Sequence, residues 1–500
     1  MTWRSWAPPI AIVALASQLI LWDLGDGVLW QDEAQTALVS RTVLTHGVPM
    51  GHDGRNHFSQ ELGAEYGESG VWRWHTWLPF YLLAVFFGLL GESTAVARLP
   101  FALAGIGAVA ATYGLGRALW PDRRDGLWAA AALATSVPFL ILVRQCRWYS
   151  LAALFSALVL WGYWALAQRR RGGGAVFAAA AVLLFHTHYL YAATALAAAF
   201  AHALYWHRDR LGPLLAWTGV ALVFCAPWIV WLAGGMEYGR VYGDSAFALA
   251  PSWDRGVTFA AKLGRHVLPP ALWIAAAVTA ALAWRSGGRD RLLDPSIARP
   301  LSLLLLALAV PLTALALASP GPFFRYLAPL LPVVALLVGR ILASVHPAVA
   351  AALLAFVVAR SPFVDYLGEL AGDFRGPVEG IVEYLNAHGD PDDLVAISYG
   401  DLPLKFYTPM RVMGGLTGED LAPAADADWI ILRRFVVARE RDGRVRDQLE
   451  AFVDPARYRR VELPIPETRF ENREEPRLHR FRSAREGEPV VLFERIREAP

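Results

Sequence analysis

Residues 7–22 read APPIAIVALASQLILW, and residues 30–34 read WQDEA. The first stretch is almost purely apolar and approaches the roughly 20 residues that an α-helix needs to span a bilayer. The chain is then mainly polar up to residue 75, and the adjacent carboxylates Asp32 and Glu33 follow soon after the apolar stretch. This order predicts a membrane helix followed by an acidic segment at the membrane surface.

The composition of the whole chain indicates a membrane protein rather than a soluble one. Of its 500 residues 56% are hydrophobic, and its mean hydropathy is +0.36. Apolar segments of near-membrane length recur at 76–91, 97–119, 126–143, 148–167, 174–189, 190–206, 213–233, 267–284, 300–319, 324–342 and 346–363. We therefore predict an α-helical polytopic membrane protein with about 11–13 transmembrane helices.

Arginine clusters predict which turns face the cytoplasm, because cytoplasmic turns are rich in basic residues. The clusters lie at 169–171, at 208–210 and in the linker 285–299. By alternation, the outer face then receives residues 186–191, the loop 234–266, the turn 319–322 and the tail after 364.

A cytoplasmic N-terminus also places the loop 23–75 outside, but three apolar segments separate this loop from the outer turn at 144–148. Two outer turns must be joined by an even number of crossings. Either the segment 76–91 does not cross fully, or the total number of crossings is odd.

From about residue 370 the chain changes character. A helix is predicted at 377–388, and short apolar runs at 394–398, 429–432 and 490–493 predict strands. We predict a membrane domain at 1–366, including the outer loop 23–75 with interfacial helices. A small extracytoplasmic α/β domain is predicted at 367–500.

Several common catalytic and structural motifs are absent from the sequence. The only two cysteines, Cys146 and Cys225, lie far apart in or near apolar segments, which argues against a disulfide framework. The chain has no Gly-rich phosphate loop, no Ser-His-Asp arrangement and no CxxC pair. It therefore has no signature of nucleotide hydrolysis or acyl transfer.

Asp32 and Glu33 are the candidate catalytic residues. One carboxylate could remove a proton from an acceptor hydroxyl or bind a metal while the other orients it. The alternative is an acidic pair at a helix N-terminus, which the helix dipole favours without any catalytic role.

The same loop contains His52, Asp53 and His57, which could form a metal site, although their spacing matches no strong metal motif. An interfacial loop with an aromatic belt at Trp72–Trp77 is the preferred interpretation. A divalent metal is left open as a cofactor.

Arginines at the outer membrane edge are candidate ligands of a lipid phosphate, because a forked guanidinium suits phosphate oxygens. They could equally be snorkelling anchors or buried partners of acidic residues. Beside them, His188 could line a polar cavity or be a core histidine, and Lys262 is the only lysine of the membrane part. The predicted substrate-binding residues are Arg98, Arg144, Arg147, Tyr149, His188, Lys262, Arg325 and Tyr326.

The acidic pair, the arginines at the outer membrane edge and the apolar segments occur in an order that resembles polytopic GT-C-type glycosyltransferases that use polyprenyl-phosphate sugars. The similarity is to protein O-mannosyltransferases and to the lipid A aminoarabinose transferase. It is carried by Asp32-Glu33, Ala97-Arg98-Leu99-Pro100, Arg147-Trp148-Tyr149 and Arg325-Tyr326-Leu327-Ala328-Pro329, and it covers about residues 1–363.

The resemblance implies an inverting sugar transfer on the outer face of a bacterial inner membrane. Asp32 would act as the base on the acceptor hydroxyl, and Arg325 and Arg147 would hold the leaving phosphate. The expected partners are a polyprenyl-phosphate sugar donor, membrane lipids and an acceptor that is a protein, a lipid or a polysaccharide; nucleic acid is not expected.

The chain departs from the pattern at two places. Arg73-Trp74-His75-Thr76-Trp77-Leu78-Pro79 replaces a Lys-Pro-Pro-like entry, and Ser150 stands near the place of an aspartate. These departures bear on carrier recognition and on any metal site.

Two other functions compete with an enzyme: a transporter or flippase of a lipid-linked glycan, and a membrane scaffold with an outer recruiting domain. A transporter predicts internal repeats and matching interrupted helices, which the sequence does not show. A scaffold has no need of arginines at several outer membrane edges.

Overall fold

The computed structural model describes residues 6–233, 253–267, 294–434 and 440–497, together with positions 274, 277 and 278. The chain divides into two compact units. Unit 1 comprises Met1–Trp22, Phe101–Leu370 and Glu474–Pro476, and unit 2 comprises Asp23–Pro100, Ala371–Arg473 and Arg477–Pro500. The predicted boundaries at 1–366 and 367–500 keep the loop 23–75 with the membrane part, whereas the packing groups residues 23–100 with 371–473. Most of the predicted loop 234–266 and of the segment 267–284 lies outside the described residues.

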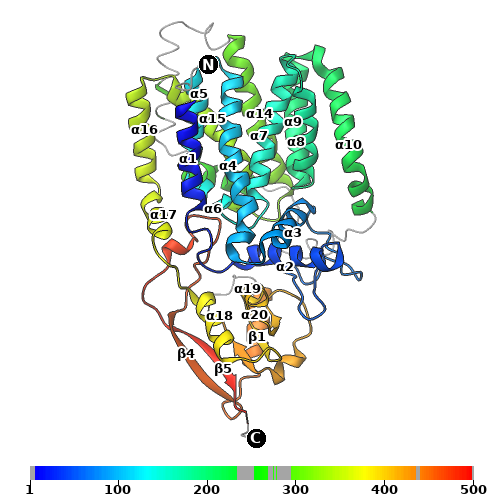
Figure 1. Cartoon of the computed structure of the whole chain (residues 1–500), viewed down its shortest axis with the longest axis vertical. Coiled ribbons are helices and arrows are strands. Elements are labelled where there is room, and N and C mark those ends of the chain that lie inside the picture. Colours follow the sequence, from blue (N-terminus) through cyan, green and yellow to red (C-terminus); the bar gives the residue numbers. More distant parts are fainter. Residues whose placement is uncertain are drawn as a thin grey trace. The chain divides into compact units, whose positions relative to one another are not determined.

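The described residues of unit 1 form α-helices and two short 3-10 helices, η2 and η3, most of them apolar (Figure 1). They are α1 (Ala7–Leu21), α4 (Thr94–Leu119, which begins in unit 2), α5 (Arg123–Ala134), α6 (Val137–Val143), α7 (Tyr149–Ala167), α8 (Gly173–Phe185), α9 (Tyr189–Trp206), η2 (Arg208–Arg210), α10 (Leu211–Ala233), α12 (Trp253–His266), α14 (Pro295–Ala318), η3 (Phe324–Leu330), α15 (Leu331–Ala343), α16 (Pro347–Arg360) and α17 (Phe363–Leu370).

Within the described residues, 5 helices are long and apolar enough to cross a membrane, or up to 7 if each bent pair counts as one span. The bent pairs are α5 with α6 and α16 with α17, and each bends by 67°. Pro138 and Pro362 lie beside these bends, where proline cannot continue the preceding hydrogen-bond ladder. The chain is a multi-pass membrane protein, and the predicted number of 11–13 crossings stays a prediction.

Small residues bring the helices of unit 1 into close contact. A Cβ atom added to Gly162 of α7 would lie 2.4 Å from the backbone nitrogen of Phe177 on α8. A Cβ atom added to Gly339 of α15 would lie 2.6 Å from the backbone of α5. Glycine therefore permits the backbone approach that drives helix association in lipid.

Contacts within unit 1 show which turns lie at the same end of its helices. The ring of Trp148 lies 4.6 Å from that of His188 and 6.5 Å from that of Tyr326. Arg169 and Asp209 form an ion pair of 2.9 Å where α7 ends and α10 is about to begin. The turns predicted to face outside thus gather at one end, and two of the arginine-rich turns meet at the other.

The contacts of Arg144 show whether the number of crossings between α1 and the 144–148 turn is even or odd. Its Nη1 atom donates hydrogen bonds to the backbone oxygens of Ile20 (2.9 Å) and Trp22 (2.7 Å), so α1 ends beside the 144–148 turn. Because the end of α1 and the 144–148 turn lie at the same end of unit 1, an even number of crossings must join them. The helix α4 and the pair α5–α6 supply two. The helix α3 (Leu78–Leu90) has only 13 residues, about 20 Å in length, which is too short for a bilayer core of about 30 Å. This agrees with the expectation that segment 76–91 does not cross fully.

Unit 2 contains a five-stranded mixed sheet flanked by helices. Its elements are α2 (Gln31–His46), α3, α18 (Pro377–His388), β1 (Leu394–Ile397), α19 (Asp401–Tyr407), β2 (Arg411–Gly414), η4 (Ala422–Asp426), β3 (Trp429–Ile431), α20 (Glu440–Glu450), β4 (Tyr458–Pro466), η5 (Arg480–Arg482) and β5 (Pro489–Arg495). The strand order is β2-β1-β3-β5-β4. β2, β1 and β3 are parallel, whereas β5 is antiparallel to both β3 and β4. The predicted small α/β domain is confirmed, and the helix predicted at 377–388 coincides with α18.

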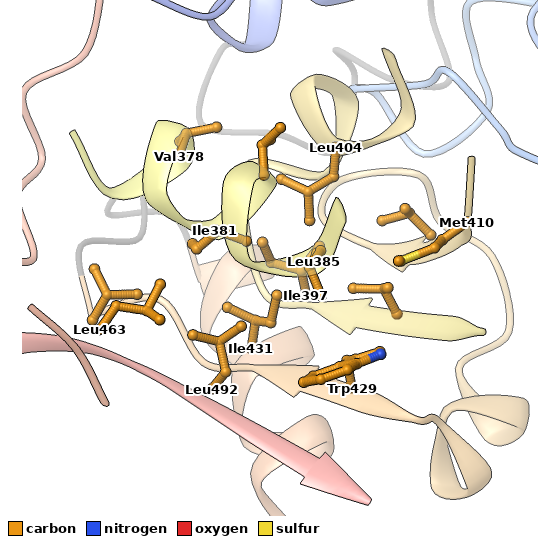
Figure 2. Close-up of a cluster of buried hydrophobic side chains, with 14 residues drawn as sticks. Val378, Ile381, Leu385, Ile397, Leu404, Met410, Trp429, Ile431, Leu463 and Leu492 are labelled. Atoms are coloured by element: carbon orange, nitrogen blue, oxygen red, sulfur yellow. The ribbon is translucent and has the colours of Figure 1, made fainter. Parts of the chain in front are cut away.

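The core of the sheet follows from the two-residue alternation of its strands. Figure 2 shows Ile397, Ile431 and Leu492 packed with Ile381 and Leu385 of α18. Ala396 and Ile430, one position along, belong to a second buried cluster that includes Leu449 of α20. Both faces of the sheet are therefore covered by apolar packing.

The loop 23–75 differs from the expected set of interfacial helices. It contains one helix, α2, and residues 47–77 form a compact loop fastened by isolated β-bridges, among them Met50 with Val71 and Tyr66 with Trp72. Trp72 is fully buried in this loop and does not join an aromatic belt. Its ring packs edge-on against Phe80 with 5.9 Å between the ring centroids, so the loop has a small core of its own.

Candidate functional site

The first turn of α2 carries the acidic pair. The segment before it is held by hydrogen bonds from Val28 N to Glu379 Oε1 (3.0 Å) and from Leu29 N to the Tyr407 hydroxyl (2.9 Å). Trp30 then takes an extended backbone conformation, and the helix begins at Gln31. Asp32 therefore lies at a fixed helix N-terminus, where the helix dipole stabilises a carboxylate.

Asp32 keeps limited access to solvent. Its side chain is 8% exposed, and its Oδ1 atom accepts a hydrogen bond of 3.2 Å from Gln60 Nε2. A carboxylate that is partly open to solvent can accept a proton from a hydroxyl. The geometry suits a general base, and the catalytic assignment stays a prediction.

Glu33 is an interior ion-pair partner. Its carboxylate is fully buried and pairs with Arg98 through two contacts, Nε–Oε1 at 2.9 Å and Nη2–Oε2 at 3.0 Å. Its Oε2 also accepts from Trp30 N (3.3 Å) and from Asn472 Nδ2 (3.2 Å). These contacts give Glu33 a structural role in α2.

Arg98 lies at the start of α4 and was a candidate phosphate ligand. Besides Glu33, it donates to the backbone oxygens of Leu24 (3.1 Å), Asp26 (2.7 Å) and Val28 (3.1 Å). The structure thus supports the alternative interpretation, in which Arg98 is the buried partner of an acidic residue. Its hydrogen bonds to the three backbone oxygens also fix the segment before α2.

A turn at residues 59–65 lies beside α2 and is built around the carboxylate of Glu65. This carboxylate is buried and accepts from the Ser59 hydroxyl, from Gln60 N (2.6 Å) and from Glu61 N (3.1 Å). Gln35 Nε2 of α2 approaches it at 3.4 Å. Burial raises the pKa of the Glu65 carboxyl to about 7.

The raised pKa of Glu65 predicts a stability that decreases with pH. Between about pH 4.5 and pH 7 the unfolded chain has lost this proton and the folded chain keeps it, so the free energy of unfolding falls as the pH rises and levels off above pH 7. We expect Glu65→Gln to flatten this part of the profile. Thermal unfolding of both proteins between pH 4.5 and 8 measures the difference, and parallel profiles would contradict the prediction.

The side chains of the described residues do not assemble the metal site that the loop 47–77 could offer. Asp53 accepts from the backbone nitrogens of Arg55 (2.9 Å) and Asn56 (2.7 Å), so it caps a turn and does not complete a cluster with His52 and His57. The three carboxylates that approach one another are Asp23, Asp26 and Asp373. Asp26 is already paired with Arg480 at 2.9 Å, so this group offers no evidence for a metal.

In unit 1 several predicted substrate-binding residues gather around Trp148. The ring of Tyr149 lies edge-on at 4.9 Å from that of Trp148, and the rings of His188 and Tyr326 flank the same indole. Tyr191, which the sequence had not singled out, donates its hydroxyl to the backbone oxygen of Tyr326 at 2.6 Å. The result is an aromatic cluster at the end of unit 1 where α1 ends, in which Trp148, Tyr149 and Tyr191 are buried and the others half-buried.

Arg144 and Arg147 border this cluster. Arg144 binds the carbonyl end of α1, as a cation at a helix C-terminus should. Arg147 is buried in the same turn. Arg144 thus helps to hold α1 against the turn that carries Trp148.

Lys262 and Arg325 face an acidic pair from the distant segment Glu474–Pro476, which packs within unit 1. Lys262 Nζ lies 2.5 Å from Glu475 Oε2, and Arg325 Nη1 lies 3.3 Å from Glu474 Oε1. His266 Nε2 lies 3.9 Å from Glu475 Oε1. Lys262 and Arg325 therefore form a small site, the oxyanion site, in which each cation is paired with a carboxylate of the chain.

A cavity of about 140 Å³ adjoins this site, since His266 belongs to its lining. Apolar residues from α5, α6, α15 and α16 make up much of its wall, and Arg265 and Arg360 add two cations. Such a cavity suits an amphiphile with an apolar chain and an anionic head group.

Comparisons with known proteins identify the fold. Residues 74–231 match the model of the dolichyl-phosphate-mannose-protein mannosyltransferase family. ArnT from Cupriavidus metallidurans bound to undecaprenyl phosphate matches with a TM-score of 0.55 and 16% identity, over 82% of this chain and 86% of that chain. The chain has the GT-C glycosyltransferase fold.

Two further structures support this GT-C assignment. The apo state of the same ArnT gives a TM-score of 0.54 and 17% identity over the same shares of both chains. The oligosaccharyltransferase AglB from Archaeoglobus fulgidus, in complex with an inhibitory peptide and a dolichol-phosphate, gives 0.55 and 11% identity, over 82% of this chain and 64% of AglB. No curated protein sequence matches the chain. The predicted resemblance to GT-C-type glycosyltransferases is confirmed.

The sequence did not reveal every residue that builds the site. Gln60 was missed because a single glutamine in a polar loop carries no signal. Glu474-Glu475 is an acidic pair like Asp32-Glu33, and that pattern was the available clue. The sequence pattern predicts one separate domain for the whole tail, so it does not indicate that this pair packs within unit 1.

Proposed function

We propose that the chain is a glycosyltransferase that moves a sugar from a polyprenyl-phosphate donor to an acceptor. The transfer takes place on the outer face of a bacterial inner membrane and inverts the anomeric configuration. The observation that carries the proposal is the oxyanion site of Lys262 and Arg325 beside an apolar cavity within a GT-C fold. An isoprenoid chain with a phosphate head group has the same two chemical parts.

The proposed reaction assigns each group one role. Asp32 accepts the proton of the acceptor hydroxyl as its oxygen forms a bond to the anomeric carbon. The bond from that carbon to the phosphate oxygen breaks, and its electron pair stays on the phosphate. Arg325 and Lys262 stabilise the charge that develops there.

Two similar structures support this donor class. One is ArnT bound to undecaprenyl phosphate, and the other is AglB in complex with an inhibitory peptide and a dolichol-phosphate. The match of residues 74–231 to a mannosyltransferase family supports transfer of a sugar. We propose an extracytoplasmic location for the α/β domain of the tail, because the arginine clusters are predicted to be cytoplasmic and alternation then puts the tail on the opposite side.

Purified protein in lipid nanodiscs tests the function directly. Incubation with polyprenyl-phosphate hexoses or pentoses and candidate acceptors should release polyprenyl phosphate, measured by mass spectrometry. Glycolipid translocation across vesicles without any release would favour the transporter instead.

The oxyanion site makes a prediction for donor affinity. Replacing Arg325 or Lys262 by glutamine removes one charge-assisted contact to the phosphate, so KM for the donor should rise by about tenfold. Arg169→Gln is the matched control, because Arg169 is exposed and pairs with Asp209 at the other end of unit 1. An unchanged KM in both test variants would remove the phosphate-binding role.

Glu475→Gln should act in the opposite direction. It removes a carboxylate that occupies Lys262 in this structure, so a donor phosphate meets less competition and KM should fall by a few-fold. Kinetics over the same donor range measure the effect. A KM that rises instead would show that Glu475 supports donor binding.

A further inference from the structure

The turn at residues 59–65 connects a buried carboxylate to Asp32 through one side chain. Glu65 lies at the centre of the turn and is 1% exposed. Its carboxylate accepts three hydrogen bonds from consecutive residues, namely the Ser59 hydroxyl and the backbone nitrogens of Gln60 and Glu61. The Ser59 hydroxyl oxygen in turn accepts from Gly63 N at 2.6 Å, which closes the turn.

These contacts fix the backbone on both sides of Gln60. Its side chain extends to Asp32, where Nε2 donates to Oδ1 at 3.2 Å. An ionised carboxylate only accepts hydrogen bonds, so the amide must present its nitrogen. One rotamer of Gln60 therefore orients the carboxylate and favours its charged form.

The other end of the turn is fastened to α2 itself. Gln35 Nε2 donates to the backbone oxygen of Phe58 at 2.9 Å and approaches Glu65 Oε1 at 3.4 Å. Gln35 lies one helical turn after Asp32 on α2. The turn and the helix thus form a closed unit, in which Asp32 and Gln60 face each other.

We propose that Gln60 is a positioning residue that orients the carboxylate of Asp32 for proton transfer, and that Glu65 holds Gln60 in place. This inference rests on the proposed function, because it assigns Asp32 the role of base. Gln60 acts through Asp32 and takes no part in binding the sugar or the phosphate.

The charged groups around Asp32 determine how a substitution of Gln60 affects the stability of the Asp32 carboxylate. On α2, Glu33 is neutralised by Arg98. On α19, which packs against α2, Asp401 and Lys405 form a buried pair of 2.6 Å, and α3 carries no charged side chain. In the turn, Glu61 adds negative charge, and Glu65 adds it only as the pH rises through its pKa of about 7. Loss of the Gln60 donor therefore leaves the Asp32 carboxylate less stabilised.

The decisive experiment compares wild type, Gln60→Ala, Gln60→Glu and Asp32→Asn in the donor-turnover assay. Gln60→Ala should lower kcat by about tenfold or more and leave KM for the donor within a factor of two. The acidic limb of its kcat/KM profile should move to higher pH. Gln60→Glu should move this limb further, because a like charge then faces Asp32.

Asn386→Ala is the matched control. Its amide also donates one hydrogen bond, from Nδ2 to the backbone oxygen of Tyr407 at 3.0 Å, in an exposed part of unit 2. It should leave kcat, KM and the pH profile unchanged. Because Gln60 is only half-buried, its variants should unfold at the wild-type temperature, which separates positioning from folding.

Glu65→Gln tests the second half of the proposal. If Glu65 acts through Gln60, the double variant Gln60→Ala/Glu65→Gln should be no slower than Gln60→Ala alone. Wild-type kcat and pH profile in Gln60→Ala, with Asp32→Asn inactive, would overturn the positioning role and leave the function standing. No turnover by wild type with any donor would overturn both.

Discussion

Asp32→Asn should lower kcat of sugar transfer by about 10²–10⁴-fold, the usual contribution of a general base. The amide has the shape of the carboxylate and lacks the basic lone pairs that take the acceptor proton. Its oxygen still accepts from Gln60 Nε2, so the contact seen at 3.2 Å can persist. The loss should therefore appear in kcat, with the folded structure and donor affinity retained.

The matched control is Asp392→Asn, which makes the same carboxylate-to-amide change at an exposed position of unit 2. Initial rates of polyprenyl phosphate release, with thermal unfolding of each protein, provide the measurement. Equal turnover in wild type and Asp32→Asn would remove Asp32 from the chemical step. A loss of turnover in Asp392→Asn as well would point to a general effect of charge.

The helical fold class of the membrane part could be predicted from the sequence, because in lipid only helices with apolar side chains can satisfy their backbone hydrogen bonds internally. The helix at 377–388 was also predicted, since its stop signal Gly389-Asp390-Pro391 is local. Strands β2 and β4 were missed. β2 begins with an arginine and ends with a glycine, and β4 carries charged residues at several exposed positions, so neither forms an apolar run.

The long-range contacts could not be predicted from local pattern. Arg98 was a reasonable phosphate ligand in the sequence, because an arginine at a membrane edge needs an anion. The structure supplies that anion from Glu33, 65 positions earlier in the chain. Likewise, Glu474 and Glu475 meet Arg325 and Lys262 only after the chain has returned from the tail to unit 1.

The buried pair of Glu33 and Arg98 makes the second large prediction. Arg98→Met leaves the Glu33 carboxylate buried without this cation and removes one donor from each of the backbone oxygens of Leu24, Asp26 and Val28. Breaking one side of a buried pair costs about 3–5 kcal/mol, so protection of residues 24–36 from hydrogen exchange should fall accordingly. Arg375→Met is the matched control, because its pair with Glu383 is exposed on the same unit and is worth about 0–1 kcal/mol.

The double variant Glu33→Gln/Arg98→Met separates a structural Glu33 from a catalytic one. A neutral amide leaves no uncompensated charge, so the double variant should be more protected than Arg98→Met alone and should recover part of its turnover. Strictly additive losses of protection would show that the two side chains are not coupled. An inactive double variant with restored protection would make Glu33 a catalytic group, because the fold around α2 would then be intact and only the carboxylate would be missing.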